Sequence, residues 1–523
     1  MLTATVPRRT TRSAPLLKLE VLVALVALAP RIGFVLISEG GYRGTFAYDP
    51  SVYYAASDAL LHGRLPYRDF VLLHPPGIMF ALAPFAWVGT MIGDHGGFMI
   101  AQVAFTVLAA VNAALVARVA ARFGFGNGAA MVAGLCYALW PGATEAEYAS
   151  RLEPLGNFAM LCGLLAYSAS ERSTRRRWSV LCGIGFSTAF CVKVWWLIPL
   201  VLVLAWHLPA QRRARLPLVA AGAALPILLI DGPFFLASPV AMIRMVFTDQ
   251  LGRSRQGRLL PRLAEFSGGG DRLRGLGDMQ AAWVVLAVAL VLVLICRAAV
   301  RVPHGPPLVA LLLIQLALIA WAPSYFPYYN DYAAPALALT LAAAVHGRRV
   351  RPVVRRVFAI PVLMLGIGAL VAADLALPRP VIFAYPAREL MRSVAHSRCV
   401  MSDSPMALVE LNVLSRDLAN GCPNWVDVTG RTYSVDKPFR DGSGHWVART
   451  YDPRWQRDLR RYLLSGDTLT LFRPYYTGVG AELRFILAGQ VVLARSGNFT
   501  VFRTSPLRPW HRPPTRLAPR GAR

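Results

Sequence analysis

Twelve apolar runs follow one another along the chain, and several approach the 17–25 residues that a helix needs to cross a bilayer. The runs lie near 16–38, 76–93, 96–118, 127–140, 154–170, 178–192, 194–208, 217–237, 281–297, 307–322, 331–346 and 357–376. Only 16% of the residues are charged, against roughly 25% in an average soluble domain. This pattern excludes a single soluble globule and predicts a polytopic membrane protein.

The basic residues give the chain a formal net charge of +27, but they are clustered in short segments between the apolar runs. That arrangement is typical of membrane loops and does not favour a nucleic-acid-binding surface. The clusters are Arg8/Arg9/Arg12, Arg118/Arg122, Arg172/Arg175/Arg176/Arg177, Arg212/Arg213/Arg215, Arg297/Arg301 and Arg348/Arg349/Arg351/Arg355/Arg356.

The orientation of the chain follows from these clusters, because arginines in short loops stay in the cytoplasm. If every apolar run crossed, the first cluster would be cytoplasmic and the other five would lie outside. If residues 76–93 instead lie on the outer face without crossing, all six become cytoplasmic. The prolines at 75, 76 and 84 and the tryptophan at 87 suit such an interfacial segment. The sequence therefore predicts eleven spans in a plasma membrane, with a cytoplasmic N-terminus.

The same topology gathers carboxylates on the outer side. Residues 1–376 contain 17 Asp and Glu, and all but Glu20 and Glu171 fall in external loops or near outer helix ends. Acidic residues contribute little to orientation, so their distribution is independent of the arginine rule. It predicts an acid-lined outer surface, although longer external loops alone would also produce it.

Three regions are expected from these patterns. Residues 1–376 form an all-α membrane domain, 377–505 form a small soluble extracytoplasmic α/β domain, and 506–523 form a disordered basic tail. The strand-like and helix-like segments of the second region are, in order, strand 399–403, helix 405–415, strand 468–472, helix 480–488 and hairpin 490–503.

Cys399 and Cys422 are the only cysteines of the second region. In an oxidising compartment they would form a disulfide that closes a loop of 24 residues, counting both ends. Two free buried thiols are the alternative.

The first external loop places Asp49 just outside the first apolar run, among tyrosines. A carboxylate at the lipid–water boundary can serve as a general base. The alternative is a structural role, because Asp-Pro commonly opens a helix and Asp49 could cap one over 50–62. The loop continues with Pro66-Tyr67-Arg68-Asp69-Phe70 and ends at His74-Pro75-Pro76-Gly77.

The second external loop carries three carboxylates in nine residues, Glu145, Glu147 and Glu153, together with Arg151. They mark either a reactive site or a solvated loop with Glu153 at a helix N-terminus. Lys193 lies between two apolar runs near the outer face, where a charge usually has a partner or a ligand, unless it snorkels to water.

A run of aromatic residues opens the apolar segment at 331–346 and includes Tyr328 and Tyr329. Aromatic side chains are common at membrane interfaces, so a simple interfacial belt is the alternative to a binding role.

These features resemble the GT-C superfamily of membrane glycosyltransferases, which use polyprenyl- or dolichyl-phosphate-linked sugars. They are most similar to the family 39-like branch, with the protein O-mannosyltransferases and the lipid A aminoarabinose transferase. The resemblance covers residues 16–346. It rests on Asp49, the Pro-Tyr-x-Asp block at 66–69, Pro75–Pro76, the acidic second loop, Lys193 and the Tyr-Tyr-x-x-Tyr-x-x-Pro element at 328–335.

The resemblance implies an inverting transfer of a sugar, commonly mannose or a pentose, from a polyprenyl-phosphate donor to a hydroxyl of a cell-envelope acceptor. Asp49 acts as a base or orients the acceptor, and a second-loop carboxylate assists. The implied catalytic residues are Asp49, Glu153, Glu147 and Asp69. The implied contacts to the donor phosphate and lipid are His74, Arg68, Arg151, Lys193, Tyr328 and Tyr329.

The sequence departs from the family pattern at two positions. Relatives often carry a second acidic residue directly after the Asp of the first loop. This chain has Pro50 at that position, so it stays open how Asp49 and other residues share the catalytic work. Relatives often place Lys before the proline pair, where His74 stands, so Arg68, Arg151 and Lys193 compete as phosphate ligands.

The expected partners are the lipid-linked donor, a glycan, lipid or protein acceptor, and membrane lipid, without a cofactor or an obligatory metal. Two other classes of protein compete with the enzyme. A transporter or lipid flippase would favour internal repeats and polar groups at mid-membrane depth. A non-catalytic assembly protein would use its C-terminal domain to bind glycan.

Overall fold

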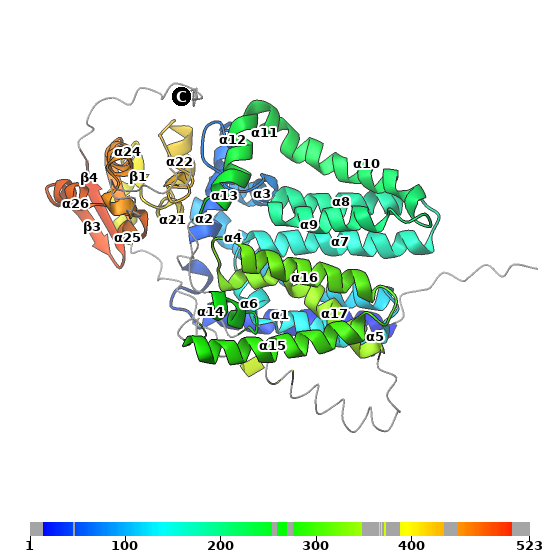
Figure 1. The fold of residues 1–523 in the computed structure, drawn as a ribbon. Helices are drawn as coiled ribbons and strands as arrows, with labels where there is room; N and C mark the ends of the chain where they lie inside the picture. The colour runs from blue at the N-terminus through cyan, green and yellow to red at the C-terminus, as the bar shows by residue number, and fades with distance from the viewer. Residues whose placement is uncertain are drawn as a thin grey trace, which may run out of the picture.

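The computed structural model describes residues 14–44, 48–253, 259–268, 276–347, 388–432 and 448–504, together with 273, 366, 368, 371 and 372. The last predicted span, 357–376, and the predicted tail, 506–523, lie almost wholly or wholly outside the described residues. Figure 1 shows a bundle of long helices with a smaller domain at one end.

The helical domain extends to Gly347. Its first half consists of α1 (Ala14–Leu36), η1 (Gly41–Arg43), α2 (Tyr48–Leu61), α3 (Gly77–Ile92), α4 (Asp94–Arg122), α5 (Gly126–Ala138), α6 (Pro141–Glu147), α7 (Leu152–Arg172), α8 (Arg177–Val192), η2 (Val194–Trp196) and α9 (Leu197–Trp206). Its second half consists of η3 (Arg213–Arg215), α10 (Leu216–Pro226), η4 (Ile227–Asp231), α11 (Gly232–Ala237), α12 (Pro239–Ile243), η5 (Arg244–Thr248), α13 (Asp249–Leu251), α14 (Leu259–Glu265), α15 (Asp278–Ala299), α16 (Gly305–Trp321), η7 (Pro327–Ala333) and α17 (Ala334–Gly347).

Four helical segments among the described residues are long and apolar enough to cross a membrane: Leu16–Leu36, Asp94–Arg122, Arg213–Ala237 and Asp278–Ala299. In α15 only 6% of the apolar window is buried inside the protein. A helix that exposes leucines and valines along its length is stable in lipid rather than in water. The chain is therefore a membrane protein, while the predicted count of eleven spans stays a prediction.

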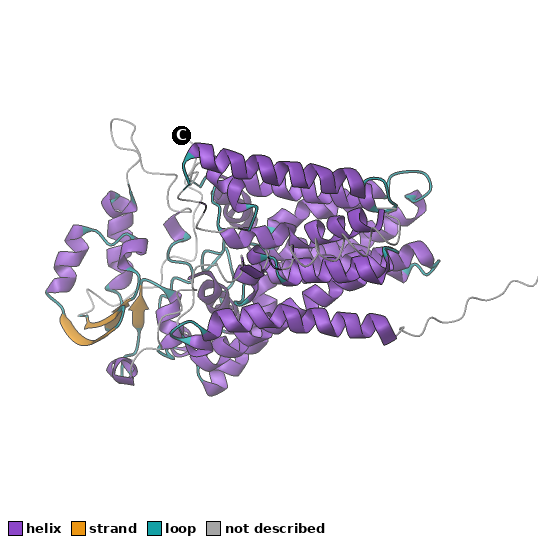
Figure 2. Ribbon diagram, turned by 90° about the horizontal axis from the view of Figure 1, so that it is seen from below, coloured by secondary structure: helices purple, strands orange, loops and turns teal. Residues whose placement is uncertain are grey.

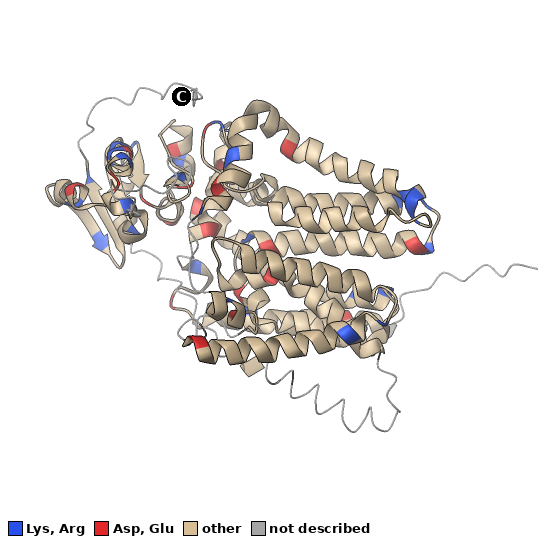
Figure 3. Ribbon diagram, in the orientation of Figure 1, with Lys and Arg blue, Asp and Glu red and all other residues tan. Residues whose placement is uncertain are grey.

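The arginine clusters that the structure describes meet at one end of this bundle. Arg172 donates to the backbone carbonyl of Arg122, and Glu171 contacts both Arg212 and His304. In Figure 3 the basic residues of the bundle lie mainly at the end away from the smaller domain. The described arginine clusters thus lie at one end of the bundle, which is the arrangement that the predicted orientation needs.

Both ends of α3 lie at the opposite end of the bundle. Its start is packed on the end of α8, since a Cβ added at Gly77 would lie 2.5 Å from the carbonyl oxygen of Cys191. Its other end meets the C-terminal domain, where the backbone N–H of His95 donates to Asn412 over 3.0 Å. A segment with both ends on one side does not cross, which agrees with the interfacial position predicted for 76–93.

The C-terminal domain consists of α20 (Arg388–Val394), β1 (Val400–Ser402), α21 (Pro405–Glu410), α22 (Leu414–Ala419), η9 (Arg449–Tyr451), α24 (Pro453–Leu463), β2 (Thr468–Leu471), α25 (Pro474–Thr477), α26 (Ala481–Ala488), β3 (Val491–Ser496) and β4 (Phe499–Arg503). Its sheet has the order β1-β2-β4-β3, with β1 parallel to β2 and the other pairs antiparallel. The predicted strands 399–403 and 468–472, helix 480–488 and hairpin 490–503 are found with slightly shifted ends, whereas the predicted helix 405–415 ends at Glu410 and a separate helix, α22, begins at Leu414. Figure 2 shows the sheet apart from the long helices.

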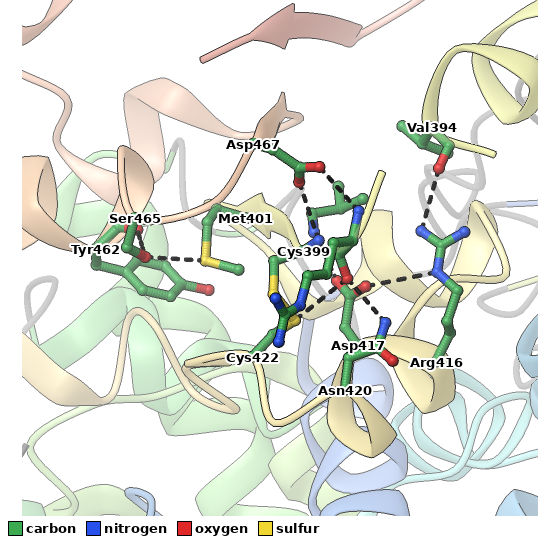
Figure 4. Close-up of a disulfide and its surroundings, with 12 residues drawn as sticks. Val394, Cys399, Met401, Arg416, Asp417, Asn420, Cys422, Tyr462, Ser465 and Asp467 are labelled. Atoms are coloured by element: carbon green, nitrogen blue, oxygen red, sulfur yellow. Dashed lines mark hydrogen bonds and ion pairs between the residues drawn. A yellow bond between two sulfur atoms is a disulfide. The ribbon is translucent and has the colours of Figure 1, made fainter. Parts of the chain in front are cut away.

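Cys399 and Cys422 form a disulfide with a Cα–Cα distance of 5.6 Å. The bridge joins the residue before β1 to the loop after α22, and Figure 4 shows Asp417 and Asp467 beside it. Asp467 accepts hydrogen bonds from the backbone N–H groups of Arg398 and Cys399, each over 2.9 Å. The predicted pairing is confirmed, and the free-thiol alternative is wrong.

The two domains share one hydrophobic core, which continues from Val52 and Leu82 into Val400 and Leu408. Polar contacts reinforce this junction: the hydroxyl of Ser415 donates to both Asp58 and Asp94. The C-terminal domain is therefore held against the loops of the helical domain that carry the candidate residues.

Candidate active site

A cavity of about 470 Å³ lies between the helical domain and the C-terminal domain, at the end opposite the arginine clusters. It is lined by residues from both domains: Tyr48, Asp49, Val52, Tyr53, Leu72, Leu73, His74, Arg151, Leu152, Glu153, Lys193, Arg253, Phe326, Tyr328, Tyr329, Asp427, Thr429, Gly430, Arg449, Arg473 and Tyr476. Seven of the ten residues that the sequence predicts for the site are among them.

Asp49 lies in the first turn of α2 and faces the cavity. Its Oδ2 accepts a hydrogen bond of 2.7 Å from the phenol of Tyr328, which η7 positions. Among the described residues its side chain makes no hydrogen bond to a backbone N–H of α2, so the contacts favour a role in the cavity over the capping alternative.

Arg151 is a buried cation, 5% exposed, immediately before α7. Its guanidinium packs on the ring of Tyr328, 3.9 Å from the centroid, and one nitrogen donates to the hydroxyl of Tyr148 over 3.4 Å. Its Nε and Nη1 are buried and have no hydrogen-bond partner among the residues that the structure describes. Buried donors of this kind cost free energy unless a ligand satisfies them, and a planar guanidinium fits a phosphate.

Lys193 and Glu153 form a buried ion pair of 2.6 Å. Lys193 lies where the chain turns from α8 into η2, and its ammonium packs on the rings of Trp195 and Tyr329, 3.7 and 4.0 Å from the centroids. The lysine therefore has a buried carboxylate partner and is held by aromatic faces, so it does not snorkel. Glu153 is correspondingly occupied with orienting this cation.

His74 also lines the cavity, and its backbone carbonyl accepts a hydrogen bond of 2.7 Å from the phenol of Tyr67. Burial, and then the positive charges of Lys193 and Arg253, lower the pKa of His74 well below its usual value. The imidazole is thus neutral at physiological pH and offers one N–H donor, whereas a lysine in its place would offer a charge.

Three predicted site residues lie outside the cavity. Arg68 and Asp69 form an ion pair of 2.8 Å on the surface, and Asp69 also accepts the backbone N–H of Leu65. Glu147, at the end of α6, is fully buried against Arg31 of α1, whose Nε donates to it over 2.9 Å. These side chains stabilise the first loop and the packing of α1 on α6, and they do not face the cavity.

Sequence reasoning missed the contribution of the C-terminal domain, which includes Asp427, Arg449, Arg473 and Tyr476. Asp427 lies opposite the start of α2, where its Oδ1 accepts hydrogen bonds from the phenol of Tyr48 and the backbone N–H of Gly430. Burial, and secondarily the charge of Asp49, raise the pKa of Asp427 to about 6. No motif marks these residues, because only the docking of the two domains brings them to the cavity.

Neither a protein-family model nor a curated protein sequence matches the chain. Solved structures do match it. The crystal structure of ArnT from Cupriavidus metallidurans in the apo state aligns over 92% of this chain and 97% of that chain, with 15% identity and a TM-score of 0.54. ArnT bound to undecaprenyl phosphate aligns over the same shares, with 14% identity and a TM-score of 0.52.

The chain has the GT-C fold. The alignment to ArnT covers more of the chain than the helical domain, so the likeness extends into the C-terminal domain. This is the fold that the ordered loop residues implied, and that expectation is confirmed. At 15% identity the likeness concerns the fold alone, and it assigns no reaction to the cavity.

Proposed function

We propose that this protein is a membrane glycosyltransferase that moves a sugar from a polyprenyl phosphate to a hydroxyl of a cell-envelope acceptor, with inversion, at the outer face of the plasma membrane. The observation that carries the proposal is that one cavity holds both Asp49 and Arg151, a buried guanidinium whose Nε and Nη1 have no hydrogen-bond partner in the described part of the chain. The fold adds support, since ArnT has been solved with undecaprenyl phosphate bound.

The cations explain how the donor phosphate is held. A polyprenyl chain stays in lipid, so its phosphate lies at the interface, beside residues at the ends of the membrane helices. Arg151 supplies two unsatisfied donors, and Lys193 adds a charge that Glu153 and two aromatic rings keep in place. Neutral His74 adds a hydrogen bond. These groups stabilise the charge that develops on the leaving phosphate.

Asp49 is the proposed general base. In the transfer, the acceptor oxygen forms a bond to C1 of the sugar while the bond from C1 to the phosphate oxygen breaks. The lipid phosphate leaves with the electron pair, and the hydroxyl proton passes to Asp49. The hydrogen bond from Tyr328 fixes the orientation of this carboxylate.

The position of Glu153 supports it as the assisting carboxylate of the second loop, in preference to Glu147. Glu153 lines the cavity, whereas Glu147 is held in its ion pair with Arg31. In this proposal Glu153 assists by holding Lys193 in place rather than by accepting the proton.

The proposal is tested with the purified chain in lipid vesicles and a set of polyprenyl phosphates, each carrying a different radiolabelled sugar. A crude cell-envelope fraction supplies the acceptor. We expect one label to leave the lipid phase and enter the envelope fraction. If every label stays on its lipid, the chain is not a glycosyltransferase of this kind. If a lipid-linked sugar instead crosses the vesicle membrane intact, the chain is a transporter.

A further inference from the structure

The cavity has two walls that differ in origin. One comes from the loops of the helical domain and holds Asp49, Arg151 and Lys193. The other comes from the C-terminal domain and holds Asp427, Thr429, Gly430, Arg449, Arg473 and Tyr476. The proposed transfer needs only the first wall for the donor phosphate and the base, so the second wall has no assigned role.

Asp427 lines the cavity, and only one of its two carboxylate oxygens accepts hydrogen bonds from the described residues. Its Oδ1 is occupied by the phenol of Tyr48 at 2.9 Å and by the backbone N–H of Gly430 at 2.6 Å. Its Oδ2 accepts no hydrogen bond from the described residues. A cavity-lining carboxylate that is held through one oxygen keeps the capacity to accept hydrogen bonds from a ligand's hydroxyl groups on the other.

Two arginines belong to the same wall as this carboxylate. Arg473 lies between two rings, 4.8 Å from the centroid of Tyr48 and 4.7 Å from that of Tyr476. Arg449 has a buried Nη1 that has no hydrogen-bond partner among the described residues. The same wall therefore contains an unsatisfied donor of Arg449 and a carboxylate oxygen of Asp427 that can still accept hydrogen bonds.

Tyr476 connects this wall to the solvent. It lines the cavity, yet its side chain is 63% exposed, so it lies at the mouth. Its ring contacts Tyr475, which is 79% exposed. An exposed ring beside donors and acceptors is the combination that binds a sugar, because the C–H face of the sugar packs on the ring while the hydroxyls form hydrogen bonds.

We propose that the C-terminal wall is the acceptor site and that the acceptor is a glycan. One of its sugar residues packs on Tyr476, and its hydroxyls bind Asp427 Oδ2 and Arg449. The donor is confined to the membrane side by its lipid, so a water-borne acceptor has to approach along the C-terminal domain. This assignment rests on the proposed function and names its acceptor class.

The test measures the transfer of label from the active polyprenyl-phosphate sugar to oligosaccharides released from the cell envelope of the source organism. Asp427→Asn keeps an oxygen for Tyr48 and Gly430 and turns the free oxygen into a donor. Tyr476→Ala removes the ring. In each variant we expect the KM for the oligosaccharide to rise about tenfold or more, with the donor KM within twofold of wild type.

Two matched controls lie in the same domain but outside the cavity. Tyr475→Ala removes the neighbouring exposed ring, and Asp458→Asn removes a carboxylate of α24; both should leave the acceptor KM unchanged. Unchanged acceptor KM in both test variants overturns the inference, as does label that enters only protein or only lipid. If wild-type protein releases no label from any donor, the proposed function itself fails, and the acceptor assignment fails with it.

Discussion

The phenol of Tyr328 donates a hydrogen bond of 2.7 Å to Asp49, although 279 positions separate them in the sequence. The same phenol ring also packs on the guanidinium of Arg151. One tyrosine at the start of η7 thus links the proposed base to the proposed phosphate ligand. The aromatic run that opens the last described membrane helix therefore positions site residues and is more than an interfacial belt.

Replacing Arg151 by Gln should weaken donor binding. The variant keeps a polar side chain but loses the charge and the planar fork that fits a phosphate, so we expect the Kd for a polyprenyl phosphate to rise about 10–100-fold. Binding can be measured by the quenching of tryptophan fluorescence in detergent. Arg68→Gln is the control, because Arg68 pairs with Asp69 at the surface, and it should bind as wild type does. Equal affinities of all three proteins would contradict the assignment.

The position of α3 on one side of the bundle predicts which loops an impermeant thiol reagent can reach. The test background lacks the five free cysteines and keeps the disulfide. Cysteines introduced at Asn127 and Thr174, which are exposed at the arginine-rich end, should resist the reagent in intact cells. A cysteine at Tyr475 should react. Labelling at 127 and 174 would mean that 76–93 crosses the membrane or that the whole orientation is reversed.

The stability of the C-terminal domain should fall as the pH rises. Burial raises the pKa of Asp417 to about 8, against about 4 in an unfolded chain. The folded state therefore holds a proton that the unfolded state loses, so its stability decreases between about pH 4 and pH 8. Burial likewise raises the pKa of Glu410 to about 7 and that of Asp403 to about 6, with the same sign.

Asp417→Asn isolates one of these groups. From pH 5 to pH 7 the wild-type protein should lose about 1–3 kcal/mol more stability than the variant does, as measured by thermal melting at each pH. Asp458→Asn in α24 should melt as the wild type does. Parallel pH profiles for wild type and Asp417→Asn would show that this carboxyl does not carry a proton in the folded domain.

Features fixed by local pattern were predictable. The arginine clusters predicted that the loops which carry them lie at one end of the bundle, and the Pro-Pro-Gly opening predicted that 76–93 does not run from one end to the other. Alternating apolar residues gave the strands of the C-terminal domain, and two cysteines in one domain gave the disulfide. Each of these features is determined by residues that are close together in the sequence or by the solvent that a segment faces. The sequence therefore carries the information directly.

The orientation of individual carboxylates was not predictable. Glu147 and Glu153 belong to one loop, but α6 ends at the first and α7 begins just before the second, so one points to Arg31 and the other to Lys193. The position of Asp427 was harder still to predict, because this residue reaches the cavity only through the docking of the C-terminal domain on the helical domain. Spacing along the chain does not encode such a contact.

The most direct measurement is the rate at which label leaves its polyprenyl-phosphate donor in the presence of envelope acceptor, compared between wild type and Asp49→Asn. Asparagine keeps the shape and can accept the hydrogen bond from Tyr328, but it does not take up a proton. We predict a loss of about 10²-fold or more in kcat, with donor binding and thermal stability close to wild type. Turnover at the wild-type rate would contradict the proposed role of Asp49 and return it to a structural position at the start of α2.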